Sequence, residues 1–185
     1  MFYEVKLKDY VRVPPKLIAN DVKVSVLKSL NEKYEGYISK DLGIVISVGG
    51  VDDIKEGVII PGDGAAYYDT EFKLIVFRPE LQEVLLGTVT DITDFGVFFN
   101  IGSIDGMIHI SQTMDDHVTV NKAGSLAGKD GKKVLKVNDK CRARIIAVSY
   151  KDVNNPKIGL TMRQPWLGNL KWIKDARKKD SDKEK

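Results

Sequence analysis

Five short runs rich in apolar residues follow one another in the C-terminal half of the chain, and the segments between them contain glycine, asparagine or aspartate. They lie at 84–92, 96–101, 106–111, 140–149 and 157–162. Runs of this length with turn residues between them predict β-strands. Five such strands are the number found in a small barrel. This pattern limits the fold of residues 84–163 more than any other feature of the sequence.

A long insertion, residues 112–139, separates the third predicted strand from the fourth. A segment of this length usually contains structure of its own or serves a contact. After the barrel, the pattern predicts a helix that begins at Leu170 and ends in a basic tail with frayed last residues. Neither the insertion nor the tail suggests a role from its residues alone.

The sequence of the N-terminal half predicts a different module. Its elements are expected in the order strand, helix, strand, strand. Apolar and charged residues alternate over Phe2–Val13, as in a half-buried strand. Pro14 and Pro15 end this strand and can open a helix, because proline suits the first helical position. An apolar stripe then continues this helix to Gly36.

Two further strands are expected in this half, at 37–48 and 65–77. Gly49 and Gly50 follow the first of them. The turn Pro61–Gly64 comes before the second. Both glycines of this turn, Gly62 and Gly64, are expected at positive φ.

Charge is divided unevenly along the chain of 185 residues, although the net charge is only +3. Residues 1–83 carry a net charge of −3 and residues 84–185 a net charge of +6. A surface that binds a polyanion is therefore expected in the C-terminal half.

Metal, disulfide and membrane classes are disfavoured. The chain has one cysteine, Cys141, and two histidines, too few for a zinc cage or a disulfide framework. We expect no metal and no cofactor. The N-terminus reads as a strand rather than a signal peptide, and no apolar run could span a bilayer. These features predict a cytoplasmic protein that does not bind membranes.

One dense motif carries the strongest functional signal. It comprises Gly87-x-Val89, Phe95-Gly96-x-Phe98 and Gly106-Met107-Ile108-His109-Ile110-Ser111. This pattern resembles the S-one domain, an RNA-binding module of the OB type, over residues 84–163. The resemblance implies a five-stranded OB-type barrel that binds single-stranded RNA.

The aromatic residues of the motif support this interpretation physically. Phe95 and Phe98 are three apart and would point to opposite faces of a regular strand, but a bulge at Gly96 would bring them together. Phe99 would then face the core. Two exposed rings on a small barrel form a stacking platform for unpaired bases. Either ring could instead belong to the core.

Basic residues and one histidine complete the predicted RNA site. His109, on the neighbouring strand, can stack on a base or donate a hydrogen bond to phosphate. Arg142 and Arg144 alternate with apolar residues and should point outward, where they could contact phosphates or form only a solvated face. The resemblance leads us to expect an acidic residue at the end of the fourth strand and a basic residue at the start of the fifth. Ser149 stands at the first position and Lys157 at the second, with a longer loop between them. We expect Lys157 to contact phosphate, while Ser149 departs from the usual pattern of the site.

A second resemblance covers the whole chain. It is carried by the segments Val13–Pro15, Gly57–Ala65, Phe77–Pro79, Ser111–Asp116, Arg142–Ile145 and Ile158–Pro165. Together these resemble the E′ family among the subunits of archaeal DNA-directed RNA polymerase, the counterpart of the seventh subunit of eukaryotic RNA polymerase II. Asn138 and Trp166 stand where glycine is expected. Asparagine tolerates the left-handed conformation, whereas Trp166 could pack against a partner.

The resemblance implies an α+β protein with two domains. Residues 1–82 would form a truncated RNP-like tip, and residues 83–185 the S-one barrel with its tail. The tip would dock on the polymerase core, with Pro61, Gly62, Asp63 and Gly64 in contact, and the F subunit of the polymerase would complete a heterodimeric stalk. The strand 72–77 lacks the glycine of an RNA-binding RRM, so the tip should bind protein.

Other functional classes fit the sequence less well. A free-standing RNA-binding factor of translation or RNA decay would also use an S-one barrel, but it would not need the segment Gly57–Ala65. An enzyme is disfavoured, because the sequence has no Walker loop, nucleophile elbow or zinc-ligand spacing. We therefore expect the chain to have no catalytic residues of its own.

Overall fold

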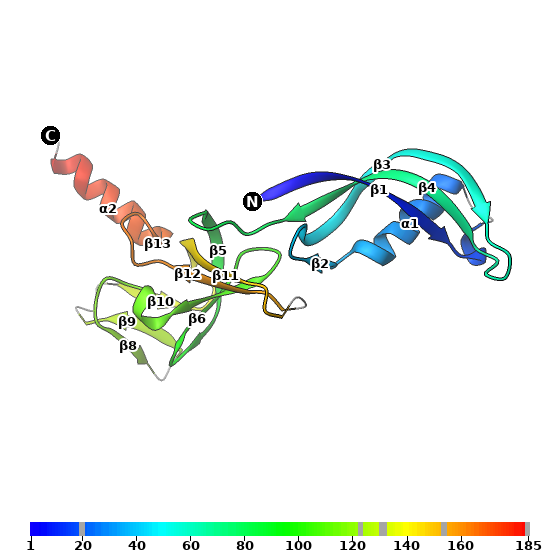
Figure 1. Cartoon of the computed structure of the whole chain (residues 1–185). Helices are drawn as coiled ribbons and strands as arrows, with labels where there is room; N and C mark the ends of the chain where they lie inside the picture. Colours follow the sequence, from blue (N-terminus) through cyan, green and yellow to red (C-terminus); the bar gives the residue numbers. More distant parts are fainter. Residues whose placement is uncertain (19–20, 122–123, 130–132, 153–154, 184–185) are drawn as a thin grey trace. The chain divides into compact units, whose positions relative to one another are not determined.

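The computed structural model describes residues 1–18, 21–121, 124–129, 133–152 and 155–183. The chain divides into two compact units, Met1–Arg78 and Pro79–Lys185, which are drawn together in Figure 1. The first is a sheet with one long helix, and the second is built around a β-barrel. This confirms the α+β class and the barrel predicted from the sequence.

The first unit is an antiparallel four-stranded sheet in the order β1-β4-β3-β2. Its strands are β1 (Phe2–Val13), β2 (Ile38–Ser39), β3 (Gly43–Ile59) and β4 (Ala66–Phe77). The strand β1 has the predicted bounds. Its register pairs Phe2 with Phe77 and Val13 with Ala66, so β1 and β4 match along their whole length.

The strand β3 runs through Gly49 and Gly50 rather than ending before them, so the prediction of a strand that ends at Val48 was wrong. Its register against β4 shifts at four places, one of them between Val48 and Gly50. Bulges of this kind absorb the glycines by bending the strand locally. Sequence alternation fails across such bulges, which is why the strand looked shorter.

The helix α1 (Val22–Tyr34) begins later than predicted. Pro15–Leu17 form only a single 3-10 turn, η1. Asp21, which the pattern placed inside the helix, is its N-cap, and its carboxylate accepts hydrogen bonds from the backbone N–H groups of Lys23 and Val24. A side-chain acceptor at this position satisfies N–H groups that have no partner within the helix.

The core of the first unit lies between α1 and the sheet. Val26 and Leu30 of α1 are fully buried and pack with Phe72 and Leu74 of β4. Figure 1 shows α1 running along one side of the curved sheet. The helix thus covers one face of the sheet, and the other face carries many of the charged side chains.

The second unit contains the five predicted barrel strands. They are β5 (Val84–Thr93), β6 (Gly96–Asn100), β7 (Asp105–His109), β11 (Lys140–Ser149) and β12 (Lys157–Thr161). The strand order is β12-β7-β6-β5-β11, and β12 also pairs with β11, which closes the barrel. Every pairing is antiparallel except the short one between β12 and β7.

Two glycines let the barrel strands approach closely. A Cβ atom on Gly87 would overlap the ring of Phe99 and the carbonyl oxygen of Asn100. A Cβ atom on Gly96 would overlap the carbonyl oxygen of Ile108. Phe99 and Ile108 are fully buried, so Phe99 lies in the core as predicted.

The insertion between β7 and β11 has structure of its own. A 3-10 turn, η2 (Ile110–Gln112), leads into an antiparallel sheet of β8 (Val118–Asn121), β9 (Ser125–Gly128) and β10 (Val134–Lys136). Leu126 and Leu135 are fully buried. Asn138, just after this sheet, adopts the left-handed conformation with φ of 69°.

A two-residue strand, β13 (Gly168–Asn169), pairs with the start of β11, and α2 (Leu170–Lys183) follows directly. The helix begins where the sequence predicted. Within the described part of the chain, neither α1 nor α2 combines the length and apolar character needed to cross a membrane.

The N-cap of α1 provides a direct test of this local structure. Replacing Asp21 with alanine removes the acceptor for two N–H groups, so we expect the free energy of unfolding to fall by about 1 kcal/mol. Urea denaturation would measure the loss. The control Glu32→Ala changes an exposed carboxylate in the last turn of α1, away from the N-cap, and should cost less than about 0.5 kcal/mol. Equal losses would contradict the assignment of Asp21 as the cap.

Candidate nucleic-acid interface

The β6–β7 hairpin sets the geometry of the predicted RNA site. Phe98 lies opposite Met107, and Gly96 lies opposite His109. Successive residues of a strand point to opposite faces, and the intervening Val97 is fully buried. The side chains of Phe98, Met107 and His109 therefore share the outer face of the barrel.

Phe95 and Phe98 lie side by side, as predicted, but for a different reason. Phe95 is in the turn before β6, where strand alternation does not apply. The predicted bulge at Gly96 was wrong: the register shift lies on β5, between Val89 and Asp91. The two rings meet edge to face with centroids 6.1 Å apart. Phe95 is 53% exposed, and Phe98 is partly buried.

Gly96 allows close packing of β6 against β7 and does not form a β-bulge. The backbone of β7 passes so close that any side chain there would overlap the Ile108 carbonyl. The hydroxyl of Thr93 donates a hydrogen bond to the Gly96 carbonyl at 2.9 Å, and the Ile110 N–H donates to the Phe95 carbonyl at 3.1 Å. These contacts fix the turn that presents the Phe95 ring.

The side chain of His109, the last residue of β7, is held by contacts with Ser111. Its Nδ1 atom accepts a hydrogen bond from the Ser111 N–H at 3.3 Å and lies 2.8 Å from the Ser111 hydroxyl oxygen. A neutral imidazole that accepts at Nδ1 carries its proton on Nε2. Because the side chain is exposed, that Nε2–H group is available to donate to a phosphate or a base.

The predicted alternation of β11 is correct. Cys141, Ala143 and Ile145 are fully buried, whereas Arg142 and Arg144 are partly exposed on the outer face. Burial raises the pKa of the Cys141 thiol to about 12, so this cysteine stays protonated at neutral pH.

The two arginines do not join the aromatic pair. Arg142 lies opposite Leu86 on β5, whereas Phe98 lies opposite Asp91 on the same strand. The five-residue separation corresponds to roughly 16 Å of strand at about 3.3 Å per residue. Arg144 is two residues further along β11. Any RNA that touches both groups must follow the barrel surface between them.

Lys157 is exposed at the start of β12. The parallel pairing of β12 with β7 places Gly159 beside Met107, so Lys157 lies toward the Asp105 end of the hairpin and His109 lies at the other end. The structure thus groups Phe95, Phe98 and His109. It distributes Arg142, Arg144 and Lys157 around the barrel.

Met107 and Asp91 were missed as neighbours of the aromatic pair. Met107 is 39% exposed between Phe98 and His109, and its alternation with buried Ile108 could have revealed it. Asp91 is exposed opposite Phe98. This carboxylate and the nearby Asp94 reduce the attraction of this face for phosphates.

The predicted docking turn of the first unit is an exposed, ordered loop. Pro61, Gly62, Asp63 and Gly64 are all exposed. Gly62 and Gly64 have φ of 97° and 68°, which confirms the positive φ predicted for both. The turn itself also has the predicted position.

The partners that hold the docking turn were not predicted from the sequence. The Arg12 guanidinium donates to both oxygens of Asp63, at 2.9 and 2.6 Å, and the Tyr67 hydroxyl donates to the same carboxylate at 2.7 Å. Arg12 lies on β1 and Tyr67 on β4. The hydrogen bonds from Arg12 and then Tyr67 lower the pKa of Asp63 to about 2.

An apolar edge precedes this turn. Val58, Ile59 and Ile60 are 61%, 65% and 47% exposed. Consecutive exposed aliphatic residues beside an ordered turn are typical of a surface that binds another protein. Among the described residues, no group of three or more His, Cys, Asp or Glu side chains is placed to hold a metal ion.

Comparisons with known proteins agree with both units. Residues 8–64 match the family "SHS2 domain found in N terminus of Rpb7p/Rpc25p/MJ0397", and residues 78–158 match "S1 RNA binding domain". The fold and these matches define a two-domain protein that joins an SHS2 unit to an S1 barrel.

Several curated relatives match this chain in sequence over most of their length. DNA-directed RNA polymerase subunit Rpo7 of Saccharolobus shibatae is 41% identical over 96% of this chain and 100% of the relative. The same subunit of Sulfolobus acidocaldarius is 38% identical over 94% and 95%. DNA-directed RNA polymerase III subunit RPC8 of Saccharomyces cerevisiae is 29% identical over 83% and 74%.

The chain belongs to the family of DNA-directed RNA polymerase subunit Rpo7. This confirms the resemblance to a polymerase subunit that the sequence motifs indicated.

The low pKa of Asp63 predicts how the docking turn responds to acid. A carboxylate with a folded pKa below its unfolded value of about 3.9 stabilises the fold fully above that value. This contribution is lost as the pH falls from about 4 toward the folded value of about 2. We expect the stability difference between the wild type and Asp63→Asn to shrink over this range in urea titrations.

Asp41→Asn, which changes an exposed carboxylate elsewhere in the first unit, is the matched control and should show a smaller dependence. A wild-type advantage over Asp63→Asn that persists unchanged at pH 2 would contradict the assigned network.

Proposed function

We propose that this chain is a non-catalytic subunit of DNA-dependent RNA polymerase that forms a stalk with the F subunit. Residues 1–82 dock on the polymerase core as the tip, and residues 83–185 hold the emerging single-stranded transcript. The observation that carries the proposal is the pairing of an SHS2 unit with an S1 barrel in one chain, aligned with Rpo7 over nearly its whole length.

A free-standing RNA-binding factor of translation or RNA decay is the alternative. Such a factor could use the same barrel, but it gives no reason for the ordered turn Pro61–Gly64 or the exposed apolar edge of Val58, Ile59 and Ile60. These features favour a chain that has a permanent protein partner.

The aromatic pair performs the proposed RNA binding. The exposed ring of Phe95 supplies a stacking face, and Phe98 supports it through the edge-to-face contact. His109 adds a donor on the adjacent strand. Stacking tolerates every base, because each base has a π-face. A subunit that holds a transcript of any sequence needs this tolerance.

Phosphate contacts in this proposal come from the spaced cations Arg142, Arg144 and Lys157. Because these cations are distributed around the barrel, few phosphates are neutralised at once, and Asp91 beside Phe98 opposes binding. Affinity should therefore be modest and should decrease with salt.

The tip supplies the protein contacts in this proposal. Pro61, Gly62, Asp63 and Gly64 form the contact with the polymerase core. The ion pair between Arg12 and Asp63 orders this turn before docking, which lowers the entropy cost of association. The F subunit is the proposed stalk partner, and the complex acts in the cytoplasm.

Replacing both Phe95 and Phe98 with alanine should weaken the binding of single-stranded RNA by about 1 to 3 kcal/mol per stacked base. Filter binding of the full chain would measure this loss. Leu86→Ala removes a side chain that is 62% exposed on the same barrel and should leave affinity within about twofold of the wild type. Equal affinity of the wild type for duplex DNA and unpaired RNA would contradict the stacking platform.

Replacing Gly62 and Gly64 with alanine should weaken association with the polymerase and leave RNA affinity unchanged. Alanine in the left-handed region costs roughly 1 kcal/mol per residue, so the turn should distort. Reconstitution with the polymerase core and the F subunit would measure association.

Gly36→Ala is the matched control, because Gly36 has φ of +73° with open space around it, away from the turn. It should carry the same backbone strain without loss of association. If the variant with alanine at Gly62 and Gly64 assembled as well as Gly36→Ala, docking through the turn would be wrong. Failure of the wild type to assemble would favour the free-standing factor.

A further inference from the structure

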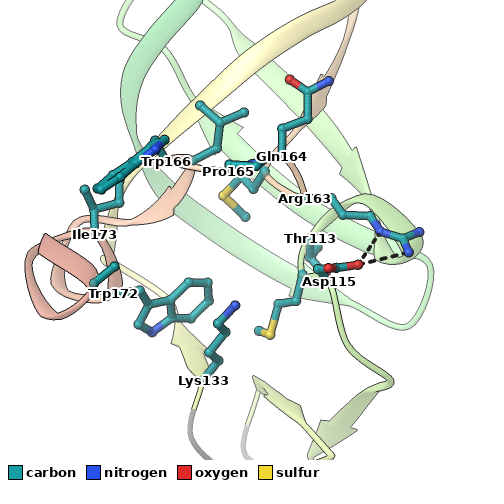
Figure 2. Close-up of a pocket in the computed structure, with 13 residues that line it drawn as sticks. Thr113, Asp115, Lys133, Arg163, Gln164, Pro165, Trp166, Trp172 and Ile173 are labelled. Carbon is teal, nitrogen blue, oxygen red and sulfur yellow. Dashed lines mark hydrogen bonds and ion pairs between the residues drawn. The ribbon is translucent and has the colours of Figure 1, made fainter. Parts of the chain in front are cut away.

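A cavity of about 350 Å³ lies between the insertion and the C-terminal helix of the second unit. Its walls include Met114, Lys133, Arg163, Pro165, Trp166 and Trp172. Figure 2 shows Trp172 beside Lys133, the Arg163 and Asp115 pair on another side, and Trp166 above Trp172 in this view. Neither Phe95 nor Phe98 contributes to it.

Both tryptophans of the chain line this cavity. Trp166 is 49% exposed and has φ of 65°, a left-handed conformation that side chains rarely adopt. A side chain held in this conformation is strained, and such strain clusters at binding sites. A large exposed ring at a strained position gives no benefit to folding that the structure reveals.

The cavity also carries positive charge. The Lys133 ammonium lies 5.9 Å from the centre of the Trp172 ring. Arg163 donates from Nε and Nη2 to the same oxygen of Asp115, at 3.1 Å each, so its Nη1 end lies outside this pair.

We propose that this cavity binds one unpaired nucleotide of single-stranded RNA, with the base stacked on Trp166 and the phosphate bound by Lys133 and Arg163. The inference rests on the proposed function and adds a second RNA contact to it. The Trp166 ring is the stacking face, because Lys133 already occupies the surroundings of Trp172. Two cations and an exposed aromatic ring match the two parts of a nucleotide.

A protein side chain is the competing occupant. The cavity has the volume of a small-ligand site, and its cations favour an anionic ligand over an apolar anchor. The test below therefore includes the outcome in which the cavity binds a protein side chain.

The test compares Trp166→Gly with Trp166→Phe in the full-length chain. Glycine removes the ring and relieves the left-handed strain, so folding should be preserved with a melting temperature no lower than that of the wild type. Phenylalanine keeps a stacking ring. Binding of a short fluorescein-labelled RNA of mixed sequence is followed by anisotropy. We expect Trp166→Gly to lower affinity by about fivefold or more, and Trp166→Phe to stay within about twofold.

Tryptophan fluorescence gives a second readout, because the only two tryptophans both lie at the cavity. Unlabelled RNA should quench the emission of the wild type with the same midpoint as the anisotropy change. The Phe95→Ala and Phe98→Ala double variant should still show quenching, at a higher RNA concentration.

The outcomes separate this proposal from the proposed function. Unchanged RNA affinity in Trp166→Gly, with reduced affinity in the Phe95 and Phe98 double variant, overturns the cavity site alone. Loss of binding to the F subunit or the polymerase core in Trp166→Gly, without loss of RNA affinity, shows a protein anchor and also overturns it. Absence of RNA binding by the wild type contradicts the proposed function itself.

Discussion

Close approach of neighbouring backbones holds the barrel together, and the candidate interface depends on it. Gly87 lies against the ring of Phe99, and Gly96 lies against the carbonyl of Ile108, at separations that leave no room for a Cβ atom. The strand β6 is thereby fixed between β5 and β7. With Phe99 fixed on the inner face, Phe98 has only the outer face available, next to the turn that presents Phe95.

The sequence predicted the elements whose signals are local. Apolar alternation and turn residues located all five barrel strands and β1, because these strands obey period-two patterning. The start of α1 was misplaced, because the side chain of Asp21 caps the helix instead of continuing it. The strand β3 was cut short at Gly49, because bulges break the alternation on which such predictions rest.

In the candidate site, too, local contacts could be predicted from the sequence and contacts between distant residues could not. The contact between Phe95 and Phe98 was predicted, although the turn rather than a bulge produces it. The bond from Arg12 to Asp63 joins residues 51 positions apart, and no local pattern encodes such a contact. The cavity around Trp166 likewise forms only when distant segments meet. The roles of the individual RNA-binding residues remain predictions.

The barrel closes through one weak seam. Two residue pairs join β7 to β12, Met107 with Gly159 and Ile108 with Leu160, and this pairing is parallel, whereas antiparallel ladders hold the other joints. Parallel pairs are slightly less stable per residue, and the least stable contacts open first in the native state. Breathing of the barrel should therefore begin at the seam between β7 and β12, beside the face that carries Met107 and Phe98, before the antiparallel joints open.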